Sequence, residues 1–219
     1  MKVTVIIPAL NEAESIGDVI KDIPRDIVQE VLVVDGHSTD NTPQIVQQAG
    51  ARVVVQEGKG YGNAISTGIK HATGDILVLI DADGSYETQD IARLVKCLEN
   101  GYDLAYGSRY RPESGSEDDT WIRFLGNKIF TLLLRWIHGV KLTDSLFFYV
   151  AGRKEIFQRI DTHLKSPSFE YCIEFPLRAH KMGFQYTEIP SFEKKRTAGH
   201  SKVRAFYDGL RILRVLLRG

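Results

Sequence analysis

Short apolar runs alternate with amphipathic stretches through the first half of the chain. The runs are apolar throughout or nearly so, as is typical of parallel strands covered on both faces. They are residues 3–7, 30–34, 52–55, 76–80 and 103–106. Alternation of strands and helices over about 100 residues predicts an α/β fold with an open, mostly parallel central sheet flanked by helices.

Helix start signals follow several of these runs. Asn11 with Glu14 is a plausible capping pair, and residues 38–40 precede a second amphipathic stretch. A third helix is expected to begin near Ala64, and Thr88 is placed to cap a fourth. The carboxyl ends of parallel strands are where such sheets bind ligands, so polar residues there are candidate site residues.

The second half of the chain is less regular. Residues 112–119 form a polar loop, and residues 124–140 have the pattern of a strongly amphipathic helix. Another helix is expected over 170–181, ending before Gly183, with a late strand at 187–189. The pattern contains no internal repeat and no low-complexity tract.

The last segment predicts an amphipathic helix. One apolar stripe comprises Val203, Phe206, Leu210, Leu213 and Leu217, and the arginines beside it are Arg204, Arg211, Arg214 and Arg218. An apolar face beside a row of arginines is typical of a helix that lies in an anionic interface. The alternative is a helix packed on the domain or on another subunit.

Charge separates this tail from the rest of the chain. Lys+Arg and Asp+Glu are equal at 28 each among 219 residues, so nothing global indicates a nucleic-acid partner. From residue 194 onward, however, the net charge is +7, and it is −7 over residues 1–193. We therefore expect one domain over 1–193 and a basic loop and helix over 194–219 that meets an anionic partner.

Compartment signals favour the cytoplasm. No apolar run approaches the ~18 residues that cross a bilayer, and Pro8 interrupts the first apolar segment, which argues against a signal peptide. Cys97 and Cys172 have no metal-ligand or CxxC spacing, so we expect free thiols in a reducing compartment. Membrane contact, if present, is expected to be peripheral.

Two aspartates end the fourth apolar run. Asp81 and Asp83 are two residues apart, so in extended geometry both side chains point to the same side. Carboxylate oxygens placed in this way suit Mg²⁺ or Mn²⁺ shared with substrate phosphates. The alternative is an ordinary turn after a strand, and Ser85 and Tyr86 do not match an EF-hand loop.

Two further segments carry candidate chemistry. Residues 58–63 are glycine-rich and precede a helix, so the backbone there can approach a ligand and Lys59 can reach a phosphate or base. The spacing fits neither a Walker loop nor a dinucleotide fingerprint, and a flexible turn is the alternative. Residues 196–202 place cations around a glycine and a serine, which suits a phosphate or diphosphate; a basic loop leading into a basic helix is the alternative.

Together the motifs resemble family 2 glycosyltransferases with the GT-A fold, of the polyprenyl-phosphate sugar synthase kind, which includes dolichyl-phosphate mannose synthases. The motifs are VTVIIPALNEAESI, EVLVVDGHSTDNT, EGKGYGNAISTGIKHATGDILVLIDADGSYE, YGSRY and RTAGHSK. The resemblance covers nearly the whole chain. It implies a nucleotide-sugar-binding half over 1–110 and an acceptor half over 111–193.

The resemblance also assigns site residues. Base, ribose and metal are expected to be held by Pro8, Ala9, Asn11, Glu12, Asp35, Lys59, Asp81, Ala82 and Asp83. The metal, Mg²⁺ or Mn²⁺, is expected at Asp83, with Asp81 reaching it directly or through water. The diphosphate and acceptor phosphate are expected at Arg109, Arg123, Arg196, Ser201 and Lys202, of which Arg109, Arg196 and Lys202 are expected to act in catalysis with Asp83.

The function implied is inverting transfer of mannose or glucose from a nucleotide-diphosphate sugar, GDP-mannose or UDP-glucose, to a polyprenyl or dolichyl phosphate. A phosphate acceptor with a second pKa near ~6 needs no strong general base, whereas a hydroxyl acceptor does; Asp144 and Glu170 are the candidate bases. Two alternatives stay open, a transferase acting on a soluble or polysaccharide hydroxyl and a non-catalytic nucleotide-sugar-binding subunit.

Overall fold

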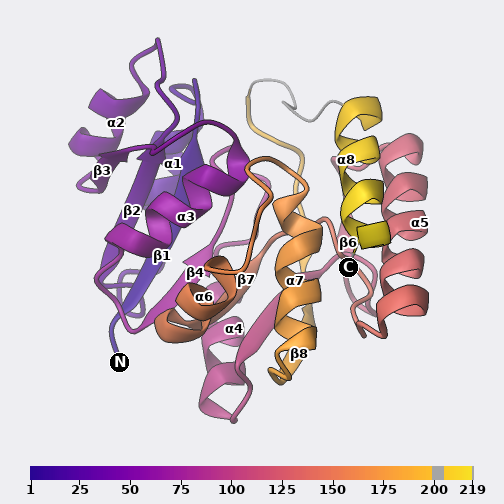
Figure 1. The fold of residues 1–219 in the computed structure, drawn as a ribbon. Helices are drawn as coiled ribbons and strands as arrows, with labels where there is room; N and C mark the ends of the chain where they lie inside the picture. Colours follow the sequence, from indigo (N-terminus) through magenta and orange to yellow (C-terminus); the bar gives the residue numbers. More distant parts are fainter. Residues whose placement is uncertain (199–204, 219) are drawn as a thin grey trace.

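The computed structural model describes residues 1–198 and 205–218, and its centre is one mixed sheet of seven strands in the order β3-β2-β1-β4-β7-β5-β8 (Figure 1). The strands are β1 Val3–Ala9, β2 Glu30–Asp35, β3 Arg52–Val55, β4 Ile76–Leu79, β5 Leu104–Ser108, β7 Val150–Arg153 and β8 Tyr186–Pro190. Only β7 is antiparallel to its neighbours. The expected α/β class with a mostly parallel sheet is confirmed.

Helices cover both faces of this sheet. They are α1 Ile16–Asp22, α2 Thr42–Gln48, α3 Tyr61–His71, α4 Asp90–Glu99, α5 Trp121–His138, α6 Lys154–Asp161, α7 Tyr171–Lys181 and α8 Ala205–Arg218. Side chains of α1, α2 and α4 form one core cluster, and side chains of α3, α5, α6, α7 and α8 form the other. Successive residues of β1, such as Val5 and Ile6, enter opposite clusters, which explains why the strands are apolar throughout.

Several element boundaries differ from the expected ones. Helix α3 begins at Tyr61 rather than near Ala64. The hydroxyl of Thr88 donates to the carbonyl of Asp22 and does not cap α4. Asn11 does not cap α1 either, because its side chain bonds a neighbouring loop instead. The sequence pattern therefore predicted the positions of these helices better than it predicted their capping residues.

The pattern did not predict β7, α6 or a small two-stranded sheet of β6 Gly115–Ser116 and β9 Phe192–Glu193. Strand β7 lies between β4 and β5. The segments before and after residue 110 therefore share one sheet.

Helix α8 packs on the domain through one side and leaves other apolar side chains exposed. Ile212 and Leu216 are buried in the core cluster that α5 and α7 also enter. Phe206, Leu210 and Leu217, from the expected apolar stripe, are 74%, 53% and 70% exposed. No helix among residues 1–198 and 205–218 is long and apolar enough to cross a membrane.

Candidate active site

Three strand ends meet at one edge of the sheet. Strand β1 pairs in parallel with β2 on one side and with β4 on the other, so their carboxyl ends lie together. Chain order reverses direction between β1 and β4, which is the position where open α/β sheets bind ligands. Asp35 ends β2, and Asp81 follows β4 by two residues. The expected grouping of these strand ends is observed.

The first two loops at this edge are tied together. Asn11 has φ 52°. Its side-chain Oδ1 accepts a hydrogen bond from the Thr39 backbone amide at 2.8 Å, and its backbone amide donates to Ser38 Oγ at 2.9 Å. Asp35 is buried and accepts from the Ser38 amide. The Glu12 amide donates to Thr42 Oγ1. These side chains thus shape the loops that follow β1 and β2.

Pro8 and Ala9 are part of the same edge through the backbone. Both lie in β1, opposite Val34 and Asp35 of β2. Ala9 is buried, and Pro8 is partly exposed. On the far side of the edge, Ala82 is buried between the two aspartates.

Asp81 is a partly buried carboxylate held by two tyrosines. Tyr61 donates its hydroxyl to Oδ1 at 2.8 Å, and Tyr86 donates to Oδ2 at 3.3 Å. Burial and the neighbouring charge of Asp83 raise the pKa of Asp81 to about 7. The two carboxylates repel each other, and a cation bound between them would relieve that repulsion.

Asp83 is partly buried as well, and the guanidinium of Arg196 lies beside it. Its Oδ1 accepts from the Ser85 amide at 3.0 Å, and its Oδ2 lies 3.5 Å from Nη2 of Arg196. Backbone bonds fix this neighbour, because the Thr197 amide donates to the Asp83 carbonyl and the Lys194 amide donates to the Ser85 carbonyl. The segment that carries Arg196 therefore lies along the DAD turn.

Arg196 is also paired with Asp118. Its Nη2 lies 2.7 Å from Asp118 Oδ2, and its Nε donates to the same carboxylate at 3.2 Å. Arg123, in the first turn of α5, contacts Asp118 as well, at 3.3 Å. The structure thus brings together two expected anion-binding residues, Arg123 and Arg196, around a carboxylate that the sequence pattern did not single out.

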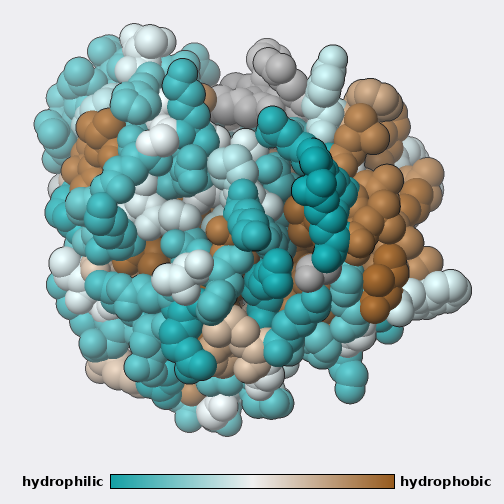
Figure 2. Space-filling model, in the orientation of Figure 1, coloured by the Kyte–Doolittle hydropathy of each residue, from teal (hydrophilic) through white to brown (hydrophobic). Residues whose placement is uncertain are grey.

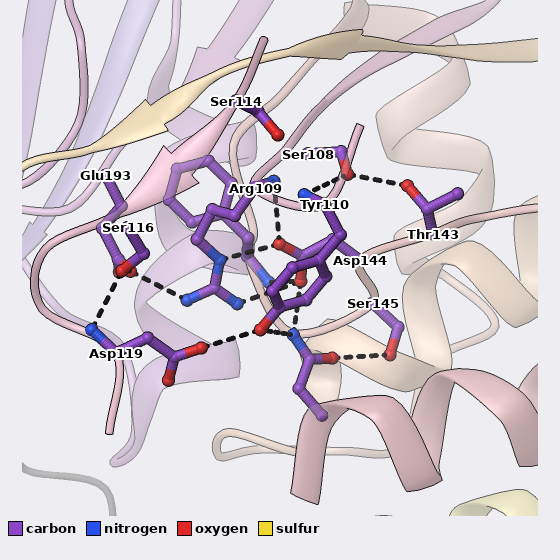
Figure 3. A network of polar contacts seen from close by, with 12 residues as sticks. Ser108, Arg109, Tyr110, Ser114, Ser116, Asp119, Thr143, Asp144, Ser145 and Glu193 are labelled. Atoms are coloured by element: carbon purple, nitrogen blue, oxygen red, sulfur yellow. Dashed lines mark hydrogen bonds and ion pairs between the residues drawn. The ribbon is translucent and has the colours of Figure 1, made fainter. Parts of the chain in front are cut away.

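Arg109 lies in a buried network rather than at an open anion site (Figure 3). Its guanidinium donates to both carboxylate oxygens of Asp144, at 2.7 and 3.0 Å, and to Glu193 at 3.0 Å. Asn127 and the backbone of Phe147 also bond Asp144. Burial alone would raise the pKa of Asp144, but Arg109 and Asn127 hold it below its usual value. The side chain expected to bind phosphate is therefore occupied by two carboxylates.

The glycine-rich loop is packed against another segment of the chain. A Cβ at Gly62 would overlap the carbonyl oxygen of Ser166 and lie 2.9 Å from the Tyr171 ring. Gly60 has φ 98°, a conformation that favours glycine. These glycines therefore serve close packing with residues 166–168, whereas Lys59, immediately before Gly60, is exposed.

The carboxylates fit a divalent cation that is shared with a substrate. Among the described residues, no group of three or more His, Cys, Asp or Glu side chains is arranged to hold a metal ion. Mg²⁺ in such sites takes one or two carboxylates and completes its shell with substrate phosphates and water. Asp81 and Asp83 supply that number. Ser201, Lys202 and His200 lie outside the described residues.

Comparison with known proteins identifies the family. Residues 4–161 match the model described as glycosyl transferase family 2. Glycosyltransferase AglJ of Haloferax volcanii is 35% identical over 201 residues, covering 90% of this chain and 64% of that protein. The dolichyl-phosphate hexose transferase of the same organism is 31% identical over 211 residues (95% and 89%). Polyprenol monophosphomannose synthase of Mycolicibacterium smegmatis is 30% identical over 212 residues (91% and 80%).

The fold has a solved counterpart. Glucosyl-3-phosphoglycerate synthase from Mycobacterium tuberculosis, crystallised with Mn²⁺, uridine diphosphate and phosphoglyceric acid, superposes with a TM-score of 0.78. That match is 21% identical and covers 99% of this chain and 78% of the other. The expected GT-A fold is thereby confirmed. On the family match and these relatives, the chain belongs to glycosyltransferase family 2.

Proposed function

We propose that this glycosyltransferase moves a hexose, mannose or glucose, from a nucleotide-diphosphate sugar to a polyprenyl phosphate with inversion at the anomeric carbon. GDP-mannose and UDP-glucose are the candidate donors. Two relatives are named as dolichyl-phosphate hexose transferase and polyprenol monophosphomannose synthase, which supports this acceptor class.

The donor is proposed to lie along the carboxyl ends of β1, β2 and β4. Base and ribose would contact the strand ends and the loop that carry Pro8, Ala9, Asn11, Glu12 and Asp35. Lys59 would lie at the edge of the nucleotide, since its side chain is exposed on the loop before α3. The diphosphate would then extend toward Asp83 and Arg196.

Asp83 is proposed as the principal ligand of Mg²⁺ or Mn²⁺, with Asp81 in support. Both Asp81 oxygens already accept hydrogen bonds from tyrosines, whereas Asp83 Oδ2 faces Arg196. The bound cation would supply electrostatic stabilisation of the departing diphosphate. Arg196 would add positive charge at the same place, and Lys202 is proposed to join it.

The observation that carries the choice of acceptor is the state of the two candidate bases. Transfer to a hydroxyl requires a carboxylate that can take a proton. Asp144 is 1% exposed and both its oxygens are bonded by Arg109, so it is not free to act as that base. Glu170 is 6% exposed, and its Oε2 lies 4.0 Å from Arg211 of α8. Because a phosphate monoester is largely ionised at neutral pH, with a second pKa near ~6, it needs no base.

We therefore propose that Arg109 does not contact the acceptor phosphate and influences its binding only by positioning other residues. It holds Asp144 and Glu193 and thereby joins the end of β5 to β9. Direct contact with the phosphate is proposed for Arg123, Arg196, Ser201 and Lys202. Arg123 is partly exposed at the start of α5.

A polyprenyl acceptor requires access to a membrane, and we propose that α5 and α8 provide it from the cytoplasmic side. The two helices pack together and expose large apolar side chains, as the brown area over them shows (Figure 2). These side chains are Trp121, Ile122, Leu125, Ile129, Leu132, Trp136 and Ile137 of α5 and Phe206, Tyr207, Leu210 and Leu217 of α8.

Charge on these helices supports the same partner. Arg123, Lys128 and Arg135 lie in α5, which has no acidic residue. Arg211, Arg214 and Arg218 lie in α8, with Asp208 as its acidic residue. Apolar and aromatic side chains beside arginines fit peripheral binding to an anionic bilayer surface.

A comparison of three acceptors tests this function. Purified protein with Mn²⁺ and each radiolabelled donor would be offered polyprenyl phosphate, the matching polyprenol and 3-phosphoglycerate. We expect an organic-soluble, mild-acid-labile product with polyprenyl phosphate alone. Equal transfer to the polyprenol or to 3-phosphoglycerate would reject the lipid-phosphate acceptor, and donor binding without turnover on any acceptor would favour a non-catalytic subunit.

A further inference from the structure

Asp118 lies between Asp83, the candidate metal ligand, and the first turn of α5. Arg196 connects it to Asp83, and Nη1 of Arg123 lies 3.3 Å from Oδ2, the Asp118 oxygen that Arg196 also contacts. The side chains of Asp83, Asp118 and Arg196 are 15%, 12% and 20% exposed, so this row of charges is largely shielded from water. The sequence pattern and the family comparison do not assign Asp118 a role.

The small sheet explains why Asp118 and Arg196 meet. Strands β6 and β9 pair Ser116 with Glu193, and the Glu117 amide donates to the Glu193 carbonyl. Asp118 follows β6 by two residues and Arg196 follows β9 by three. Their contact therefore depends on a built element rather than on two free surface side chains.

Arg196 is shared unequally between its two carboxylates. Its Nε and Nη2 make three hydrogen bonds to Asp118, the shortest at 2.7 Å, but Nη2 lies 3.5 Å from Asp83. A guanidinium that binds one carboxylate through two nitrogens is fixed in direction as well as in distance. Without Asp118, Asp83 would be the nearest carboxylate left to Arg196, and the two would be drawn into direct contact.

We propose that Asp118 is a positioning residue that holds Arg196 to one side of Asp83. Asp83 then stays open to a divalent cation, while Arg196 stays within reach of the donor's diphosphate. The inference rests on the proposed function in taking Asp83 as the cation's ligand. It adds that a third side chain regulates the competition between that cation and Arg196.

Mn²⁺ titration of the donor-free protein, followed by the electron paramagnetic resonance of free Mn²⁺, tests this directly. For Asp118→Asn we expect the Mn²⁺ dissociation constant to rise about fivefold, which corresponds to roughly 1 kcal/mol for a partly shielded ion pair. For Arg196→Gln we expect it to fall, because the competing cation is gone. The double variant should match Arg196→Gln, since Asp118 then has no arginine to hold.

Two controls separate positioning from charge. Glu117→Gln removes the same charge from the exposed neighbouring residue and should leave Mn²⁺ affinity unchanged. Asp118→Glu keeps the carboxylate and should restore most of the affinity. Thermal melting establishes that each variant is folded, and Arg196→Gln tests the competition even where Asp118→Asn does not fold.

Three results would overturn the inference. If Asp118→Asn weakens Mn²⁺ binding equally in the Arg196→Gln background, Asp118 acts through its own field and positions nothing. If neither single variant changes the affinity, Arg196 does not compete at Asp83. If wild-type protein and Asp83→Asn bind Mn²⁺ alike, the proposed metal site fails, and this inference fails with it.

Discussion

Both carboxylate oxygens of Asp144 accept hydrogen bonds from the guanidinium of Arg109, and the pair is almost completely buried. Removing one partner of a buried pair leaves the other charge uncompensated. We expect Asp144→Asn to lower the free energy of unfolding by about 3–5 kcal/mol at pH 7, measured by urea denaturation.

The same pair predicts a pH dependence. The pKa of Asp144 is held below its usual value, so the stability it contributes is present above the unfolded pKa of about 3.9 and is lost as pH falls below it. The difference in unfolding free energy between wild type and Asp144→Asn should therefore shrink below about pH 4. A difference that stays constant from pH 7 to pH 3 would contradict the ion-pair assignment.

Substitution by Ala is expected to have opposite effects on stability at Gly62, in the closely packed glycine-rich segment, and at Gly126 in α5. Gly62→Ala places a Cβ against Ser166 and Tyr171, so we expect a loss of about 1–3 kcal/mol of stability. Gly126→Ala, in α5 with nothing within 4 Å of the new Cβ, should stabilise by about 0.5–1 kcal/mol. Equal melting temperatures for the two variants would show that residues 166–168 do not pack on this loop.

The exposed surface of α5 predicts binding to anionic vesicles. Trp121 and Trp136 are 83% and 82% exposed, and we expect replacing both with Gln to weaken co-sedimentation at least about tenfold. Val55→Ser, at an exposed position of β3, is the matched control. Binding that is unaffected by the tryptophans or by added salt would exclude this surface as the membrane contact.

Lys59 is expected to bind the donor without acting on the reaction itself. Because it is exposed on the loop before α3, Lys59→Ala should raise the donor KM about three- to tenfold with kcat nearly unchanged. Lys21→Ala, an exposed lysine on α1, is the control. A fall in kcat with constant KM would instead place Lys59 at the diphosphate in the transition state.

The fold was largely predictable because its strands are local and apolar on both faces. Strand β4 is a run of four buried aliphatic residues, which the pattern shows directly. Strand β7 was missed because it is short and ends in Gly152 and Arg153, and its place between β4 and β5 depends on pairing over long separations. Helix α8 has more apolar positions than one stripe can hold, so the pattern did not show that Ile212 and Leu216 are its buried side.

The site was predictable only where its residues follow strands. Asp35, Asp81 and Asp83 lie at strand ends, so their shared edge follows from a parallel sheet. The partners of Arg109 and Arg196 could not be found in this way. Asp144 is 35 residues from Arg109, and Asp118 is 78 from Arg196; both contacts require the finished fold.

Transfer by Asp83→Ala, measured with polyprenyl phosphate and the preferred donor, tests the central claim most directly. We predict a loss of at least about 10³-fold in kcat, with the melting temperature close to that of wild type. Asp26→Ala, at an exposed position away from the site, should keep full activity. Metal-dependent transfer by Asp83→Ala at more than about a tenth of the wild-type rate would contradict the assignment of Asp83 as the cation's ligand.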